Sequence, residues 1–182
     1  MLLYTHIKSP VGRLKLVASG PNLIAVLWPD DGPFRIKLAD MREGPGHPVL
    51  VETERQLAQY FSGERRKFEL PIHFQGTPFQ HRVWRQLLRI PYGETCSYGH
   101  LAVAIGNRLA ARAVGLANRK NPLSIVVPCH RVIGASGLLT GFAGGLETKA
   151  RLLELEAIMI ARPELGVSLA KPSIEQPTPH IA

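Results

Sequence analysis

The stretch SYGHLAVAIGNRLAARAVGLAN, residues 97–118, contains two short helical patterns with a break between them. The first pattern runs from Ser97 to Ile105, the second from Arg108 to Asn118, and Gly106-Asn107 separates them. Two helices joined by so short a turn have helix-turn-helix spacing. We therefore expect this part of the chain to fold as a mostly helical domain.

The second of these helical patterns carries a basic face. Arg108, Arg112, Gly115 and Arg119 recur at i, i+4, i+7 and i+11, so they fall on one side of a helix. Alanines surround them and keep the helix slim: Ala110, Ala111, Ala113 and Ala117. An ordinary solvated basic surface is the alternative. The helix-turn-helix spacing and the arginines together favour binding to nucleic acid.

The positive charge of the chain is concentrated in the same region. The 182 residues have a formal net charge of +8. Residues 76–161 hold 10 Lys and Arg against 4 Asp and Glu, a net +6, whereas residues 1–75 hold 10 against 8. The last segment, residues 162–182, is neutral with 2 against 2. A concentrated basic surface is typical of a protein whose partner is a polyanion, with a phosphate backbone as the first candidate.

Several classes of protein are disfavoured by composition. No run approaches the ~18 consecutive apolar residues that a membrane helix needs. The start of the chain, residues 1–8, lacks a basic region followed by a long apolar run, which argues against a signal peptide. Two cysteines without a framework fit a reducing cytoplasm, and no Cys/His set has zinc-site spacing. We expect a cytoplasmic protein with no metal, no cofactor and no membrane association.

The first 76 residues predict a small α/β domain. A turn signal at residues 9–12 separates two strand patterns at 4–8 and 13–19, which indicates a hairpin. The remaining expected elements are, in order, a strand at 23–28, a loop at 29–48, a helix at 49–62 and an edge strand at 68–72.

A second domain is predicted over residues 77–161. Thr77-Pro78 opens a helix with proline at its preferred first position. A last helix spans about 147–161, and Glu156 lies on its apolar side, where a carboxylate must find a hydrogen-bonding partner. From Arg162 the chain is rich in proline, so residues 162–182 are expected to form a flexible tail.

A cysteine stands beside a histidine in Pro128-Cys129-His130, after the apolar run 124–127. We expect this run to be a strand that Pro128 ends, delivering Cys129 into a turn. A thiolate is a strong nucleophile, and an adjacent basic group lowers the pKa of a thiol. The alternative is an inert buried cysteine, since neighbouring side chains of a strand point to opposite faces. Cys96 has no evident polar partner and is expected to be structural.

These features together resemble the O6-alkylguanine-DNA alkyltransferases, also called methylated-DNA–protein-cysteine methyltransferases. The resemblance runs from about Thr77 to Glu156 without an obvious gap and leaves out the proline-rich tail. It rests on ordered motifs: Thr77-Pro78-Phe79-Gln80, Ile90-Pro91-Tyr92-Gly93, Ser97-Tyr98, Ala110-Ala111-Arg112-Ala113-Val114-Gly115, Asn121-Pro122 and Ile125-Val126-Val127-Pro128-Cys129-His130-Arg131-Val132-Ile133. It implies a ribonuclease-H-like α/β domain followed by a mostly helical domain of winged helix-turn-helix type.

The resemblance also implies catalytic roles. Cys129 would accept the alkyl group, His130 would deprotonate it through a water, and Glu156 would hold the histidine in the needed tautomer. A water relay removes the objection that neighbouring side chains point apart. Tyr98 would assist base rotation and give a proton to the departing guanine, and Asn121 would support the turn around the site.

Further positions are implied to contact DNA or the damaged base. Arg112 would enter the base stack from the minor groove while the guanine is flipped out. Other expected DNA contacts are Ala111, Arg119, Arg108 and Gly115. The alkyl and base pocket would include Phe142, Ala143 and Pro128. The family usually has a tyrosine in place of Phe142 and in some members a serine in place of Ala143, so two hydrogen bonds to the base, worth about 1 kcal/mol each, are lost.

The implied function is direct reversal of DNA damage by a monomer. The alkyl group of O6-alkylguanine, and of O4-alkylthymine, in double-stranded DNA would pass irreversibly to Cys129, once per molecule. Two other classes stay open: a non-catalytic DNA-binding protein and a cysteine hydrolase. The presence of Cys129 argues against the first, since alkyltransferase-like proteins lack the acceptor. The second predicts turnover and leaves the arginine helix unexplained.

Overall fold

A hairpin with a two-residue turn opens the fold. The computed structural model describes residues 1–29, 31 and 38–162. In it β1 (Leu2–Ser9) pairs antiparallel with β2 (Gly12–Ser19), so that Leu2 lies opposite Ser19 and Ser9 opposite Gly12. The chain leaves the turn with a positive φ, which Gly12, the first residue of β2, adopts with φ of 108°. The hairpin predicted from residues 4–19 is therefore confirmed.

Two more strands complete a sheet with the order β3-β2-β1-β4. The predicted third strand is confirmed as β3 (Asn22–Leu27), which runs antiparallel to β2. The fourth, β4 (Met41–Glu43), pairs in parallel with residues 2–4 and lies within the predicted loop 29–48. It was missed because its three residues are partly or fully exposed and show no apolar alternation.

The prediction of an edge strand at residues 68–72 is wrong. Within the described part of the chain this segment makes a single bridge, between Ile72 and Leu23. The amide of Leu23 donates to the carbonyl of Pro71, and the amide of His73 donates to the carbonyl of Leu23. Proline has no amide hydrogen, so a longer ladder is interrupted here.

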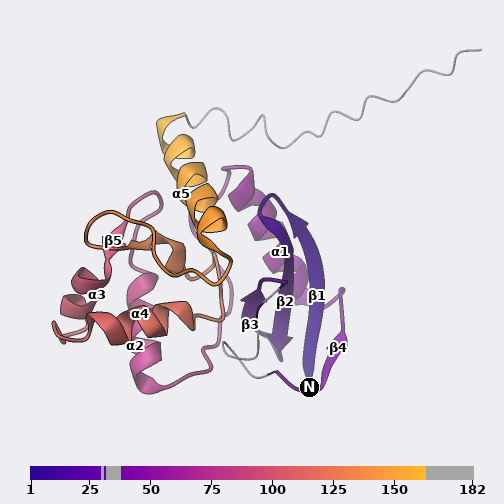
Figure 1. Cartoon of the computed structure of the whole chain (residues 1–182). Coiled ribbons are helices and arrows are strands. Elements are labelled where there is room, and N and C mark those ends of the chain that lie inside the picture. The colour runs from indigo at the N-terminus through magenta and orange to yellow at the C-terminus, as the bar shows by residue number, and fades with distance from the viewer. Residues whose placement is uncertain (30, 32–37, 163–182) are drawn as a thin grey trace, which may run out of the picture.

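The five predicted helices are confirmed in order, and two short strands and a 3₁₀ helix that were not predicted lie among them. They are α1 (Pro48–Phe61), α2 (Pro78–Leu87), β5 (Cys96–Ser97), α3 (Tyr98–Ala104), α4 (Ala111–Arg119), a 3₁₀ helix η1 (Cys129–Arg131), β6 (Val132–Ile133) and α5 (Leu146–Ala161). Helix α2 begins with a capping box between Thr77 and Gln80. Figure 1 shows the sheet on one side of the molecule and α2, α3 and α4 on the other, with α1 packed on the sheet and α5 near the junction.

The predicted basic helix is shorter than its pattern. Helix α4 starts at Ala111, with Ala110 at its N-cap, so Arg108 lies in the preceding turn. Arg108 therefore does not share a helical face with Arg112 and Arg119, as the i, i+4 spacing had predicted. The left-handed Gly106, with φ of 79°, ends the previous helical run and makes the break between the two helices.

The apolar run 124–127 is a buried turn rather than the predicted strand. Ile125 has φ of 70°, and the amide of Val127 donates to the carbonyl of Leu123. A positive φ at a β-branched residue is strained, and surrounding packing must hold it in place. All residues from 121 to 130 are buried, so this packing is present. As predicted, Cys129 follows Pro128 in a turn, here the first residue of η1.

One hydrophobic core spans both halves of the chain. Its buried residues come from β1–β3, from the helices α1 to α5 and from the turn that carries Cys129. Hydrogen bonds join the halves as well: the indole Nε1 of Trp28 donates to Ser124 Oγ over 3.0 Å, and the amide of Val26 donates to the carbonyl of Pro122 over 2.8 Å. The N-terminal sheet therefore supports the cysteine turn directly. Among the described residues, no helix has the length and apolar character needed to cross a membrane.

Candidate active site

The cysteine, the histidine and the following arginine form one turn of 3₁₀ helix. Cys129, His130 and Arg131 are all buried. Successive residues of a 3₁₀ helix are rotated by about 120°, so the opposed geometry of a strand does not apply here. The backbone of this turn is held from two sides. Asn118 Nδ2 donates to the carbonyl of Cys129 over 3.3 Å, and Asn121 Nδ2 donates to the carbonyl of Val127 over 2.9 Å.

The carboxylate of Glu156 lies at the centre of a buried hydrogen-bond network. Its side chain is fully buried on α5 and meets His130 Nε2 at 2.8 Å. Arg131 donates to both carboxylate oxygens, from Nε to Oε2 and from an Nη to Oε1, each over 2.9 Å. The amide of Gly93 and the hydroxyl of Tyr60 donate over 2.9 and 2.7 Å. The hydrogen-bonding partners that the apolar position of Glu156 required are therefore present.

The protonation states in this network follow from its contacts. Burial alone would raise the pKa of Glu156, but hydrogen bonds and charge from His130 and Arg131 outweigh it and hold this pKa at about 2. Burial lowers the pKa of His130 despite the opposing pull of Glu156. Near neutral pH the carboxylate is therefore charged and the imidazole neutral. A charged carboxylate has no proton to give, so the hydrogen between the two belongs to Nε2 of His130.

The other ring nitrogen of His130 is left as a base. Because Nε2 carries the hydrogen, Nδ1 has a free lone pair. Among the described residues Nδ1 is buried and has no hydrogen-bond partner. A proton acceptor thus lies on the residue next to the thiol of Cys129.

Lys149 is a buried residue of the site that the sequence analysis missed. Its side chain is fully buried, and its ammonium donates to the carbonyls of Val132 and Thr140 over 2.5 and 2.7 Å. Burial lowers the pKa of Lys149, whereas the nearby thiol of Cys129 raises it. The signal was present in the sequence. The buried positions of α5 are 149, 152, 156 and 159, so Lys149 falls on the same helix face as Glu156.

The glycine-rich loop 141–145 lies against the N-terminal lobe. The ring of Phe142 meets that of Trp28 edge to face, with centroids 5.7 Å apart. A Cβ on Gly144 would come within 2.6 Å of the same indole, so only glycine allows this approach. Phe142 and Ala143 are half-buried and pack against the main core, which also contains Cys129.

Tyr98 connects Thr140, the residue before this loop, to the helix-turn-helix. It is the first residue of α3, and its hydroxyl lies 3.4 Å from the carbonyl of Thr140 and 3.3 Å from Thr140 Oγ1. Gly115 of α4 faces the ring of Tyr98, since a Cβ there would meet the ring at 3.6 Å. Gly115 therefore lies where α3 approaches α4, three residues after Arg112 and four before Arg119 on the same helix.

The arginines of the helix-turn-helix are free to meet a partner. Arg112 and Arg119 on α4 and Arg108 in the turn before it are exposed, and Ala111 is half-buried. Leu109 is 93% exposed beside them, so this face also presents apolar surface. Of the predicted DNA contacts, Arg108, Ala111 and Arg112 thus lie at or just before the start of α4, Gly115 at its middle and Arg119 in its last turn.

A side chain at Gly93 would be strained and would displace Ile160. Gly93 has φ of 76°, and a Cβ there would overlap Ile160 Cδ1 of α5. Because Ile160 is 47% exposed and its terminal methyl can move, we expect Gly93→Ala to lower the free energy of unfolding by about 1.5–2.5 kcal/mol, mostly through backbone strain. Chemical denaturation measures this loss.

Gly137→Ala is the matched control for that substitution. Gly137 has φ of 81°, but nothing lies within 4 Å of a Cβ built there. Gly137→Ala should therefore lower the free energy of unfolding through backbone strain alone, by about 1 kcal/mol. Equal losses for the two variants would contradict the proposed overlap, as would a failure of Ile160→Ala to relieve the Gly93→Ala loss.

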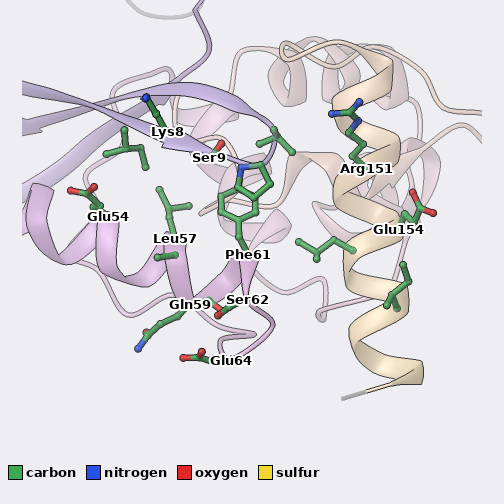
Figure 2. A pocket seen from close by; sticks show the side chains of 16 residues that line it. Lys8, Ser9, Glu54, Leu57, Gln59, Phe61, Ser62, Glu64, Arg151 and Glu154 are labelled. Carbon is green, nitrogen blue, oxygen red and sulfur yellow. The ribbon is translucent and has the colours of Figure 1, made fainter. Parts of the chain in front are cut away.

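A separate groove of about 720 Å³ lies between the hairpin turn, α1 and α5. Figure 2 shows its walls, with Lys8 and Ser9 from the hairpin, Leu57 and Phe61 from α1, and Arg151 from α5. None of the predicted site residues lines it. The groove is therefore distinct from the candidate active site.

Comparisons with known proteins agree with this arrangement. Residues 2–74 match the family model "6-O-methylguanine DNA methyltransferase, ribonuclease-like domain", and residues 78–158 match "6-O-methylguanine DNA methyltransferase, DNA binding domain". The expected fold class, a ribonuclease-like α/β domain before a helical DNA-binding domain, is confirmed. The finer boundaries at 1–76 and 77–161 stay predictions. Of the predicted tail, residues 163–182 lie outside the described residues.

Individual relatives cover most of the chain. A methylated-DNA–protein-cysteine methyltransferase of Mycolicibacterium paratuberculosis is 46% identical over 163 residues, which cover 86% of this chain and 93% of the relative. The constitutive enzyme of that name from Bacillus subtilis is 45% identical and covers 87% and 97%. The crystal structure of Mycobacterium tuberculosis OGT in complex with DNA superposes with a TM-score of 0.79 at 47% identity, covering 85% and 92%. This chain is a member of the 6-O-methylguanine DNA methyltransferase family.

Proposed function

We propose that this protein repairs DNA by moving the alkyl group of O6-alkylguanine, and of O4-alkylthymine, to Sγ of its own Cys129. The observation that carries the proposal is the buried chain from Cys129 through His130 to Glu156, with 2.8 Å between the histidine and the carboxylate. The names of the relatives, which are methylated-DNA–protein-cysteine methyltransferases, support the reaction class.

The proton of the thiol leaves through His130. A water between Sγ and the free Nδ1 carries the proton to the imidazole, which becomes imidazolium. Glu156 stabilises that charge through Nε2, and its pKa of about 2 keeps it ionised throughout. The positive charge of buried Lys149 lies close enough to the thiol to favour the thiolate.

The thiolate then displaces guanine from the alkyl carbon. The S–C bond forms as the C–O6 bond breaks, in line, and guanine leaves with the electron pair. The hydroxyl of Tyr98 gives the departing base its proton, and the imidazolium of His130 releases the former thiol proton, which restores the phenol of Tyr98. Guanine therefore gains one proton, and the protein as a whole loses one. The product is a thioether, which has no easy way back, so each molecule reacts once.

DNA binding delivers the base to this site. We propose that α4 enters the minor groove, that Arg112 fills the space of the flipped nucleotide, and that Ala111, Gly115, Arg108 and Arg119 contact the DNA on either side of it. Phe142, Ala143 and Pro128 would line the base pocket, and Asn121 would keep the turn before Cys129 in place. The relative solved with DNA supports a DNA partner. We further propose that the protein acts as a monomer in the cytoplasm, where its two free cysteines stay reduced.

Intact mass tests the proposal. The protein is incubated with an excess of a duplex that contains one O6-methylguanine. We expect a gain of about 14 Da in every active molecule, with no second gain at longer times. Release of free methanol with repeated turnover would instead identify a hydrolase, and lesion binding without any gain would identify a non-catalytic binding protein.

The two exposed arginines of α4 should differ in their effects. We expect Arg112→Ala to slow transfer about 10- to 100-fold even at saturating DNA, because base flipping loses its wedge. Arg119→Ala should weaken binding to all sequences and reduce the slope of log affinity against log salt by about 1, while saturating DNA restores the rate. Single-turnover kinetics over a range of DNA and salt concentrations separates them, and matching losses at saturation would contradict these roles.

A further inference from the structure

Tyr60 connects the N-terminal lobe to the catalytic carboxylate. It lies near the end of α1, is fully buried, and its hydroxyl donates to Glu156 Oε1 over 2.7 Å. His130 Nε2 meets the same oxygen at 2.8 Å. The tyrosine and the histidine therefore compete for the charge of one carboxylate oxygen.

The ring of Tyr60 is enclosed by three other aromatic rings. Phe61, Phe68 and Tyr92 surround it with ring centroids 5.3, 5.5 and 6.0 Å away. Burial, and then the charge of Glu156, raises the pKa of Tyr60 well above its usual value. The phenol thus keeps its proton at any pH at which the protein is assayed, and it acts as a fixed donor.

We propose that Tyr60 is a positioning residue for alkyl transfer, which holds Glu156 in place and limits how strongly Glu156 pulls on the N–H of His130. The inference rests on the proposed function, because it assigns a role within that reaction. It gives the N-terminal domain a direct part in the chemistry, although the acceptor and its base lie in the other domain.

The physical reason is the sharing of one charge. A hydrogen bond to a carboxylate withdraws part of its negative charge, so each donor weakens the pull on the others. Other charged groups also face Glu156 and His130. Arg131 from η1 binds both oxygens, and Lys149 from α5 lowers the pKa of His130. Tyr92 packs against Tyr60, and the guanidinium groups of Arg66 and Arg131 lie 5.7 and 5.5 Å from its ring centroid.

Tyr60→Phe removes the donor and leaves the ring in place. Glu156 then pulls more strongly on His130, the imidazolium is favoured, and the pKa of His130 rises. Because the neutral imidazole is the base, the acidic limb of the pH–rate profile should move to higher pH by about 0.5–1 unit. The rate above the limb should fall about 5- to 20-fold, because Glu156 loses one anchor.

Tyr92→Phe is the matched control. Its ring packs against that of Tyr60, but its buried hydroxyl has no hydrogen-bond partner among the described residues. We expect no shift of the acidic limb for this variant. An unmoved limb in Tyr60→Phe, or an equal shift in both variants, would overturn the inference, even if Tyr60→Phe lowered stability or rate.

Incorporating 3-fluorotyrosine at position 60 gives a test that keeps the hydroxyl of this residue. Fluorine makes the phenol a stronger donor without changing its length, so the limb should move to lower pH, opposite to the Tyr60→Phe shift. No movement, or movement to higher pH, would contradict the proposal even if Tyr60→Phe did not fold. The unsubstituted protein is assayed in parallel. If it fails to take up a methyl group, the proposed function fails; if it reacts and the limb does not respond, only the role of Tyr60 fails.

Discussion

Cys129→Ala is expected to abolish the mass gain of about 14 Da while leaving binding to the damaged duplex intact. The thiol is 3% exposed and sits in a turn whose backbone is held by Asn118 and Asn121, so the shorter side chain should change little else. The arginines of α4 lie on the protein surface and are unaffected. A complete loss of transfer with unchanged affinity, measured by mass and by fluorescence anisotropy, is the expected result.

Cys96→Ala is the control for this experiment. Cys96 in β5 is the other free cysteine among the described residues, half-buried, and burial raises the pKa of its thiol, which disfavours the thiolate. This variant should take up one methyl group at the rate of the unsubstituted protein. A gain that survives in Cys129→Ala, or disappears in Cys96→Ala, would show that the acceptor has been assigned to the wrong residue.

Glu156→Gln is expected to be the most damaging isosteric change. It leaves the buried guanidinium of Arg131 without its counter-charge, which costs about 3–5 kcal/mol of stability. It also removes the charge that fixes the tautomer of His130 and stabilises its imidazolium. By comparison with the loss of a tautomer-fixing carboxylate in other enzymes, the transfer rate should fall about 10³- to 10⁴-fold.

Glu154→Gln provides the comparison on the same helix. Glu154 is exposed, belongs to the lining of the groove in Figure 2 and lies two residues before Glu156. The unfolding free energy of this variant should stay within about 0.5 kcal/mol of that of the original protein, and its transfer rate within a factor of about two. Rates are measured at low temperature, where both variants remain folded. A Glu156→Gln rate within a factor of about ten would contradict the tautomer role.

Much of the fold followed from local sequence signals. The hairpin turn at 9–12, the capping residues Thr77 and Gln80, and the apolar face of α5 each specify an element through nearby residues. The wrong strand predictions share a cause that is not local. Residues 124–127 form a turn and not the expected strand. Leu123 bridges to Val26, and the surrounding packing holds Ile125 at a positive φ. No local sequence pattern reveals either contact.

The residues of the site also divide into those that the sequence revealed and those that only the structure shows. Cys129, His130 and Glu156 were proposed from the motif and its resemblance, and the structure brings the last two to 2.8 Å. Tyr60 could not be found from the sequence, because it lies 96 residues from Glu156 and belongs to another domain. Arg131 stood in the motif without a role, and Lys149 was visible only as a position on a helix face. Contacts between distant segments depend on tertiary packing.

Transfer of a trideuteromethyl group tests the central claim most directly. The protein reacts with a duplex whose O6-methylguanine carries three deuterons, and the digested product is mapped by tandem mass spectrometry. We predict a gain of about 17 Da on the peptide containing Cys129, on its sulfur, with at most one label per molecule and none on Cys96. A label on any other residue, or loss of the methyl group from the DNA with no label on the protein, would contradict the account.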